Sequence, residues 1–237
     1  MRQTFAILTM LSLATPIFAQ QSTHRFSLYI LGIKAGTINA ITTKNGHAFS
    51  VSGSLTPTRL MRSIHKVGYK GQSAGVLRDT IYRTNRYSGQ TQTGSRTSQV
   101  QMRFDNGTPS VDAYLPEREA RAYDIDPNAQ HSTIDPLTAA AAVLFDDQAT
   151  ATLCNRTTPM FDGRRRSKLS LGKPQINDAG ATCNSAYTRI AGFSPEDMQE
   201  RVNFPFTLVY THIDAENYRL ISFTTKTTFG SASAKRK

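Results

Sequence analysis

The 237-residue sequence lacks the short motifs that mark many enzymes. It contains no glycine-rich phosphate loop and no dinucleotide fingerprint, which excludes the common nucleotide-binding sites. It also lacks internal repeats, low-complexity linkers and parallel βαβ units, so a doubly wound α/β fold is excluded. The five histidines are scattered, and none forms the His-Glu-x-x-His pattern of zinc hydrolases. We therefore expect no metal site and no cofactor.

Cysteine is also scarce, with only Cys154 and Cys183 in the chain. An even pair in an oxidising compartment most often forms a disulfide. A metal site is a poor alternative, because no Cys or His lies at ligand spacing beside either residue. We predict a structural disulfide that stabilises the fold by roughly 3–4 kcal/mol.

The N-terminus has the pattern of a secretory signal peptide. Arg2 precedes an apolar stretch from Phe5 to Phe18, and Ala19 is a suitable small residue for cleavage. The stretch is too short and too broken to be a membrane span, and a buried N-terminal helix is the alternative. We expect residues 1–19 to be removed after Ala19, leaving a periplasmic protein of residues 20–237 that forms a single β-rich domain.

The chain has few acidic residues for its many basic ones. Its formal net charge is +11, of which Arg2 contributes one, so the mature chain would carry +10. This excess favours an anionic surface or ligand, and the alternative is that the charge only keeps an exported protein soluble. The expected compartment argues against nucleic acid as the partner.

The remaining sequence is dominated by period-two alternation broken by turn signals, which is typical of antiparallel β-structure. The turns are marked by Asn45-Gly46, Asp105-Asn106-Gly107 and Asp162-Gly163. We predict a mainly β fold: a large curved antiparallel sheet or partly open β-barrel of about eleven strands. Its concave face would hold a helix or a ligand.

One main helix and two short ones interrupt this pattern. The main helix is expected to have Asp135 as its N-cap and Pro136 at its first position, and Leu137 to Phe145 carry its apolar face. A short helix is expected with Thr56 as its cap and Pro57 in its first turn, and another is opened by Ser194-Pro195-Glu196.

Ser73 lies in a Gly-x-Ser-x-Gly pattern, "GQSAG", which is also the pattern of a hydrolase nucleophile elbow. That motif requires a sharp turn from a strand into a helix, but the residues that follow alternate as a strand. We interpret the match as chance, with Ser73 in a hairpin, and expect no enzymatic activity. A hydrolase using Ser73 is the least favoured alternative.

Three consecutive arginines, Arg164, Arg165 and Arg166, follow the Asp162-Gly163 turn. Strand alternation would place Arg164 and Arg166 on one face and Arg165 on the other. These guanidinium groups are suited to a phosphate or carboxylate, and Arg189 on the neighbouring strand would join them. The alternative is hydration or salt-bridging to nearby acids.

Three aromatic residues, Phe204, Phe206 and Tyr210, are expected on one face of a later strand. They would line the hollow of the curved sheet or simply belong to its core.

Several segments together resemble a known family: "YDIDP", "TIDPLTA", "MFDGRRRSKLSLG", "AGFSPEDM" and "FPFTLVY". The sequence resembles a family of exported, alphaproteobacterial-type proteins classed only as a domain of unknown function. The resemblance runs from about His24 to the C-terminus and supplies no catalytic residue. It implies a curved sheet similar to that of periplasmic proteins that carry lipoproteins or maintain the envelope.

We therefore expect a non-enzymatic periplasmic envelope protein that binds an amphiphilic or anionic ligand, or a partner segment, on a concave sheet. The expected partner is an anionic lipid, another envelope component or an envelope protein. The alternative is a structural or interaction module with a packed core and a basic surface.

Overall fold

The computed structural model describes residues 19–64, 66–227 and 230–237. The predicted signal peptide lies outside these residues except for Ala19. All the strands described belong to one sheet of fourteen strands, and neighbouring strands are antiparallel. The mainly β fold is therefore confirmed, but the expected number of about eleven strands was too low.

The first seven strands are consecutive neighbours in the sheet, as expected for a series of hairpins. They are β1 (Gln20–Ile30), β2 (Ile33–Asn45), β3 (Ala48–Pro57), β4 (Val67–Arg78), β5 (Ile81–Thr93), β6 (Arg96–Asp105) and β7 (Thr108–Leu115).

The second half of the chain continues the sheet from β1, through β14, back to β9. Its strands are β8 (Gln148–Ala149), β9 (Thr157–Phe161), β10 (Arg166–Asn177), β11 (Gly180–Ala191), β12 (Asn203–His212), β13 (Asn217–Thr227) and β14 (Gly230–Arg236). The two-residue β8 pairs with β13.

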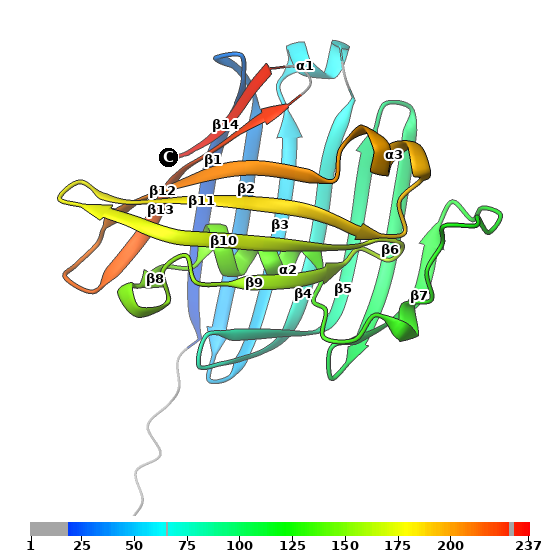
Figure 1. Cartoon of the computed structure of the whole chain (residues 1–237), viewed down its shortest axis with the longest axis horizontal. Coiled ribbons are helices and arrows are strands. Elements are labelled where there is room, and N and C mark those ends of the chain that lie inside the picture. Colours follow the sequence, from blue (N-terminus) through cyan, green and yellow to red (C-terminus); the bar gives the residue numbers. More distant parts are fainter. Residues whose placement is uncertain (1–18, 65, 228–229) are drawn as a thin grey trace, which may run out of the picture.

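The sheet folds over into two layers, with the main helix between them (Figure 1). Strands of the second half cross in front of β2 to β6 at a steep angle. The edge strands β7 and β9 are joined through the segment at Thr133 and Ile134. Thr133 donates its N–H to Gly107 O beside β7, and the N–H of Ile134 donates to Pro159 O on β9. The result is a nearly closed barrel.

The main helix begins where the sequence predicts. Asp135 is the N-cap of α2 (Pro136–Ala140), and the helix continues as a wider turn, η2 (Ala141–Phe145). Leu137, Val143 and Phe145 are buried in the core cluster. The alanines of this segment allow it to approach the sheet closely, so the helix fills much of the barrel interior.

The two short helices are present as predicted, α1 (Arg59–Ile64) and α3 (Pro195–Glu200), together with single turns η1 (Pro127–Ala129) and η3 (Thr150–Thr152). Ser194 caps α3 by accepting the N–H of Asp197. At α1 the capping oxygen belongs to Thr58, which accepts the N–H of Met61. Thr56 was expected there, but it still belongs to β3.

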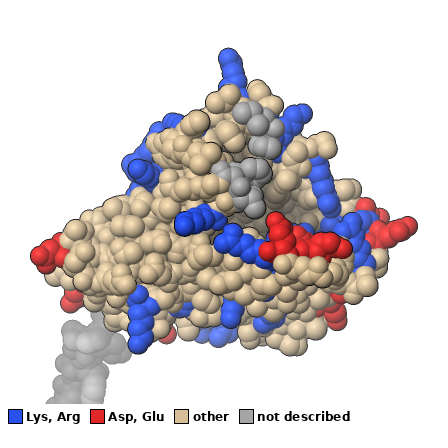
Figure 2. Space-filling model, turned by 45° about the horizontal axis from the view of Figure 1, so that its top comes forward, with Lys and Arg blue, Asp and Glu red and all other residues tan. Residues whose placement is uncertain are grey.

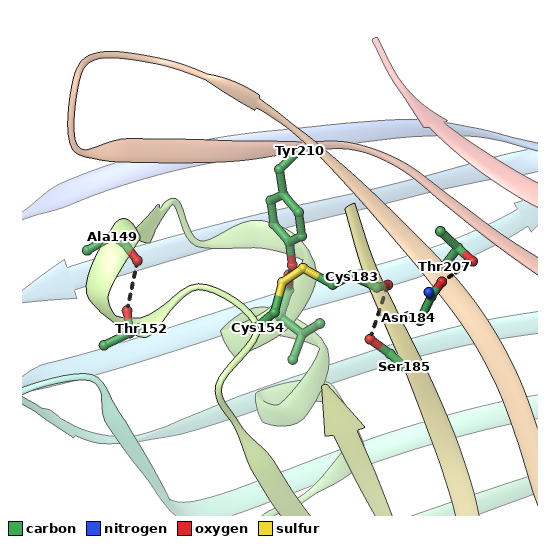
Figure 3. The surroundings of a disulfide bond; sticks show 9 residues. Ala149, Thr152, Cys154, Cys183, Asn184, Ser185, Thr207 and Tyr210 are labelled. Carbon is green, nitrogen blue, oxygen red and sulfur yellow. Dashed lines mark hydrogen bonds between the residues drawn. A yellow bond between two sulfur atoms is a disulfide. The ribbon is translucent and has the colours of Figure 1, made fainter. Parts of the chain in front are cut away.

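Cys154 and Cys183 lie at disulfide-bonding distance, with their Cα atoms 6.0 Å apart. The pair connects the segment before β9 to β11 and lies beside the ring of Tyr210 (Figure 3). Both cysteines are buried in the core.

His24 joins the first and last strands at one end of the barrel. Its Nδ1 lies 3.2 Å from Nη1 of Arg236, and its Nε2 lies 2.9 Å from Oγ1 of Thr42. Because arginine can only donate, Nδ1 must accept and the ring is neutral with its proton on Nε2. Arg236 also donates to the carbonyl of Leu144, so this contact ties β14 to the helix segment.

We expect this contact to make stability fall on acidification. Burial and the charge of Arg236 lower the pKa of His24 below 6.5, while Asp146 and Asp147 raise it and Arg219 lowers it further. The contribution of neutral His24 to the free energy of unfolding is therefore fully present above pH about 6.5, and it is lost as the pH falls from there through the lower pKa of His24 in the folded state. Urea unfolding across this range should show a smaller loss in His24→Gln than in the unmodified protein. His212→Gln, at an exposed histidine, should match the unmodified protein.

Candidate anion-binding site

The turn that carries the arginine cluster is built around Asp162. Its Oδ1 accepts the backbone N–H groups of Arg164 and Arg165 at 2.9 and 2.8 Å. Gly163 has a φ of +102°, and a Cβ at this position would approach Cγ2 of Val100 within 2.6 Å. Glycine therefore allows the turn to pack tightly against β6.

This turn changes how the three arginines are directed. Arg164 and Arg165 belong to the turn, and β10 begins only at Arg166. The strand alternation that would pair Arg164 with Arg166 therefore does not apply. Arg164 and Arg165 line one cavity together, whereas Arg166 points to Gln130 Oε1 and the carbonyl of His131.

The cavity beside the turn has a volume of about 480 Å³. Strands β4, β5 and β6, the end of β7, the start of α2 and the turn itself form its walls. We call it the arginine–tyrosine cavity, after its lining residues Tyr69, Tyr87, Tyr114, Arg96, Arg164, Arg165, Asp162, Gly89, Thr91, Thr93, Ser98, Gln99, Val100 and Pro136.

The arginines of this cavity have no carboxylate partner. Within the described residues, no ion pair joins Arg96, Arg164 or Arg165 to an acid. The guanidinium of Arg164 instead lies over the ring of Tyr114, 3.5 Å from its centroid. Burial lowers the pKa of Arg164, and the nearby charges of Arg118 and Arg96 act in the same direction, while Tyr114 and Asp124 raise it. A bound anion would offset this repulsion.

Asp162 contributes an acceptor to the same cavity. Only its Oδ1 is used by the backbone of the turn. The residue lines the cavity, and its Oδ2 takes no part in these two backbone hydrogen bonds. Burial raises the pKa of Asp162, while the charges of Arg165 and Arg164 and the two backbone hydrogen bonds lower it. The site thus combines cations with one acceptor for a ligand hydroxyl or amine.

Two tyrosines on neighbouring strands form the opposite wall. The hydroxyls of Tyr69 and Tyr87 are 3.2 Å apart. A Cβ at Gly71 or Gly89 would come within 2.3 or 2.2 Å of these oxygens, so each glycine makes room for a phenol. Burial raises the pKa of both tyrosines, which keeps the hydroxyls protonated as donors.

The other predicted binding residues lie elsewhere. Arg189 on β11 donates to the carbonyls of Asp197 and Arg201, and its guanidinium faces Phe193 and Phe204. It therefore holds α3 against the sheet and is not part of the cavity lining.

The three aromatic residues of β12 do share its inner face. Phe206 and Tyr210 belong to the buried core, and the hydroxyl of Tyr210 donates to the carbonyl of Val143. Phe204 is half-buried and packs against Tyr187 and the arginines around it. These rings are packed against the interior of the barrel and do not line the arginine–tyrosine cavity.

Ser73 lies in the middle of β4, so the expected hairpin location is wrong. The real turn is at Asp79 and Thr80, whose φ angles of 57° and 139° are positive without a glycine. The Ser73 side chain is buried and contacts Asp135, Thr138 and the carbonyl of Arg86. Among the described residues, no histidine is hydrogen-bonded to Ser73, and the residue lies within a strand and not at a strand-to-helix turn. The hydrolase motif therefore has no structural counterpart here.

Sequence reasoning missed Arg96 and the three tyrosines of the cavity. A usable signal was present for two of them. The pattern Tyr-x-Gly occurs at Tyr69 to Gly71 and again at Tyr87 to Gly89. This spacing is consistent with a tyrosine ring that packs over the glycine two residues further along the same strand.

Two classes of feature are not found in the described part of the chain. Residues 19–64, 66–227 and 230–237 contain no cluster of three or more His, Cys, Asp or Glu side chains arranged to hold a metal ion. In the same residues, none of the helices has the length and apolar character to cross a membrane.

Comparison with known proteins identifies a family but no activity. A family model described as "Protein of unknown function (DUF3108)" matches residues 25–174. The segments "AGFSPEDM" and "FPFTLVY" lie beyond this match. No curated protein matches the chain. The crystal structure of a β-barrel-like protein of domain of unknown function DUF1849 from Brucella abortus is similar with a TM-score of 0.48 and 10% identity, covering 94% of this chain and 98% of that one.

Proposed function

This chain belongs to the DUF3108 family of unknown function, and because that description assigns no activity, we propose from the cavity's geometry that it is a non-enzymatic binding protein. The arginine–tyrosine cavity would hold the anionic group of a ligand. The anionic group belongs to an amphiphilic or anionic molecule, or to a segment of a partner protein.

One observation carries the proposal: Arg96, Arg164 and Arg165 line the same cavity, and none of them forms an ion pair with an acid in the described part of the chain. Unpaired guanidinium groups at short range repel one another, and a phosphate or carboxylate accepts two parallel N–H groups from each. The stacking of Arg164 on Tyr114 holds one guanidinium in place before the ligand arrives. Less side-chain entropy is then lost on binding.

The cellular setting of the proposal is the periplasm. The basic residue, apolar stretch and Ala19 at the N-terminus support cleavage of residues 1–19. The cysteine pair at disulfide distance is compatible with an oxidising compartment. We propose residues 20–237 as the mature β-rich domain of the cell envelope.

A second candidate function is a structural or interaction module. It is favoured by the packed interior, where α2 and residues such as Leu208, Leu220 and Tyr210 fill the space between the layers. On this view the cavity is only a recess in a basic surface that contacts an envelope partner.

Three adjacent arginines provide a matched test of the binding function. Arg164→Ala/Arg165→Ala removes two cavity cations, whereas Arg166→Ala removes a neighbour that points away. We expect the double variant to bind dodecyl phosphate at least tenfold more weakly, because a hydrogen bond to a charged group contributes about 1.5–3 kcal/mol. Arg166→Ala should bind within about twofold of the unmodified protein. Titration calorimetry measures both affinities, with neutral dodecyl maltoside as the control ligand.

Native mass spectrometry of the protein purified without detergent complements the titration. A co-purifying adduct that disappears in the double variant, but not in Arg166→Ala, supports the cavity as a ligand site. Equal binding of dodecyl phosphate by all three proteins, or no binding by any of them, would refute the anion site and favour the interaction module.

A further inference from the structure

One end of the barrel presents apolar side chains to solvent. It consists of the β1–β2 turn, α1 and the first residues of β4, which the antiparallel order of the strands places together at the top of Figure 1. Leu31, Ile33 and Leu60 are 66%, 60% and 57% exposed there. The start of β2 and the residue before α1 are joined by a hydrogen bond in which the N–H of Thr58 donates to Ala35 O. We call this the α1 end.

The α1 end also carries only positive charge. Lys34, Arg59, Arg62, Lys66 and Lys70 are exposed, and none of them has an ion-pair partner among the described residues. The first acidic residue of the whole sequence is Asp79. In Figure 2 the uppermost part of the surface shows Lys and Arg but no Asp or Glu; the acidic side chains lie lower, with the largest group right of the middle.

A cleft beneath α1 connects the two kinds of side chain. It has a volume of about 500 Å³ and is lined by Arg62, Lys66 and Lys70 together with apolar Leu55, Pro57 and Val67. No acidic residue lines it. The cleft is therefore suited to a phosphate group whose attached apolar portion lies against the neighbouring aliphatic side chains.

We infer that the α1 end docks on an anionic phospholipid bilayer surface. Exposed aliphatic residues at a turn and a short helix would enter the boundary of the acyl chains, while the surrounding cations contact the head groups. Each Lys or Arg near an anionic bilayer strengthens binding by roughly fivefold, and apolar burial adds to this. The absence of acidic side chains along this end makes the charge complementary to such a surface and not to a mixed protein surface.

This docking surface is separate from the arginine–tyrosine cavity. Tyr69 lines both the cleft beneath α1 and that cavity, but none of the apolar or basic residues named above lines the cavity. The inference therefore does not depend on the anion site, and Arg164→Ala/Arg165→Ala should leave bilayer binding unchanged.

Vesicle flotation tests the inference with the chain that begins at Gln20, which retains every described element of the sheet. The probes are vesicles of phosphatidylglycerol mixed with phosphatidylcholine, and vesicles of phosphatidylcholine alone. We expect binding to the anionic vesicles that weakens as salt is raised, because exposed charges are screened. Arg62→Glu/Lys66→Glu should lower the partition coefficient at least about twenty-five-fold, and Ile33→Glu/Leu60→Glu should lower it at least tenfold.

Matched controls come from exposed positions outside the α1 end. Ile81 is 62% exposed at the β4–β5 turn, the end of β4 away from α1, and Ile176 is 51% exposed near the β10–β11 turn in the other layer (Figure 1). Ile81→Glu/Ile176→Glu and Arg78→Glu/Arg83→Glu make the same chemical changes and should keep most of the binding. Thermal unfolding of each variant verifies that its fold is retained.

Three outcomes would overturn the inference. One is equal binding to both kinds of vesicle, and another is an equal loss in the control variants. The third is no flotation at all, including the case in which the cleft binds only free inorganic phosphate in a calorimetric titration.

Discussion

Replacing Asp135 with alanine is expected to lower the free energy of unfolding by about 3–4 kcal/mol. The carboxylate is fully buried at the start of α2. Its Oδ1 accepts the N–H groups of Leu137 and Thr138 at 2.9 and 3.0 Å, and its Oδ2 accepts the hydroxyls of Ser73 and Thr84 at 2.7 Å. One side chain therefore joins the helix to β4 and β5.

The expected loss has two parts. An N-cap contributes typically about 1 kcal/mol, and a buried hydroxyl left without its partner costs about 1–3 kcal/mol. Ser73 and Thr84 limit the second part, because Ser73 also contacts the carbonyl of Arg86 and Thr84 contacts Thr138. Burial raises the pKa of Asp135, while hydrogen bonds from Thr138, Thr84 and Ser73 lower it. Urea unfolding measures the change.

Asp126 provides a matched control. It is the N-cap of η1 and accepts the N–H of Asn128 at 2.9 Å, but its side chain is exposed. Asp126→Ala should cost no more than about 1 kcal/mol. Asp135→Asn should fall between the two, because an amide oxygen preserves the cap while the NH₂ group replaces an acceptor for the hydroxyls. A loss in Asp135→Ala no larger than in Asp126→Ala would contradict the connecting role of this carboxylate.

The helix of Asp135 also shows what sequence predicts well. Asp135 and Pro136 were identified as cap and first position because both preferences arise within one turn of backbone. The same holds for Ser194 at α3 and for the glycine-containing turns at Asn45-Gly46 and Asp105-Asn106-Gly107. Local chemistry decides these features, so local sequence is sufficient.

Features that depend on distant contacts were not predictable in the same way. Ser73 contacts Asp135 across 62 residues, and Arg164 lies over Tyr114, which belongs to the opposite edge strand. The alternation of apolar and polar residues along a strand does not predict which strands come into contact when the sheet closes. The Asp79-Thr80 turn was missed for a local reason, because it adopts positive φ angles without glycine or asparagine. As a result the residues that follow Ser73 were interpreted as one alternating strand across the real turn, and Ser73 was placed in a hairpin.

The arginine cluster lies between these two cases. Its association with an Asp-Gly turn was predictable, and Asp162 does form that turn. The directions of the side chains were not, because strand alternation begins only where the strand begins, at Arg166. The hydrogen bonds to Asp162 fix the backbone of the turn at Arg164 and Arg165, and the side chains of both residues line the same cavity.

Removing the cysteine pair is the second large effect that we expect. Cys154→Ala/Cys183→Ala should lower the free energy of unfolding by about 3.5 kcal/mol, since the cysteines are 29 residues apart and the cross-link restricts the unfolded chain. The enclosed loop contains β9, the Asp162 turn and β10. Without the cross-link, the whole segment that carries Arg164 and Arg165 is therefore unrestricted in the unfolded chain.

The comparison that isolates the cross-link is between the reduced and oxidised forms of the unmodified protein. Reduction keeps both sulfur atoms in the core beside Tyr210 (Figure 3), whereas alanine also removes their packing. We therefore expect reduction to account for most of the loss in the double alanine variant, with a larger urea m-value as the unfolded chain expands. A loss below about 1 kcal/mol on reduction would show that the packing of this segment, and not the covalent link, holds the arginine turn in place.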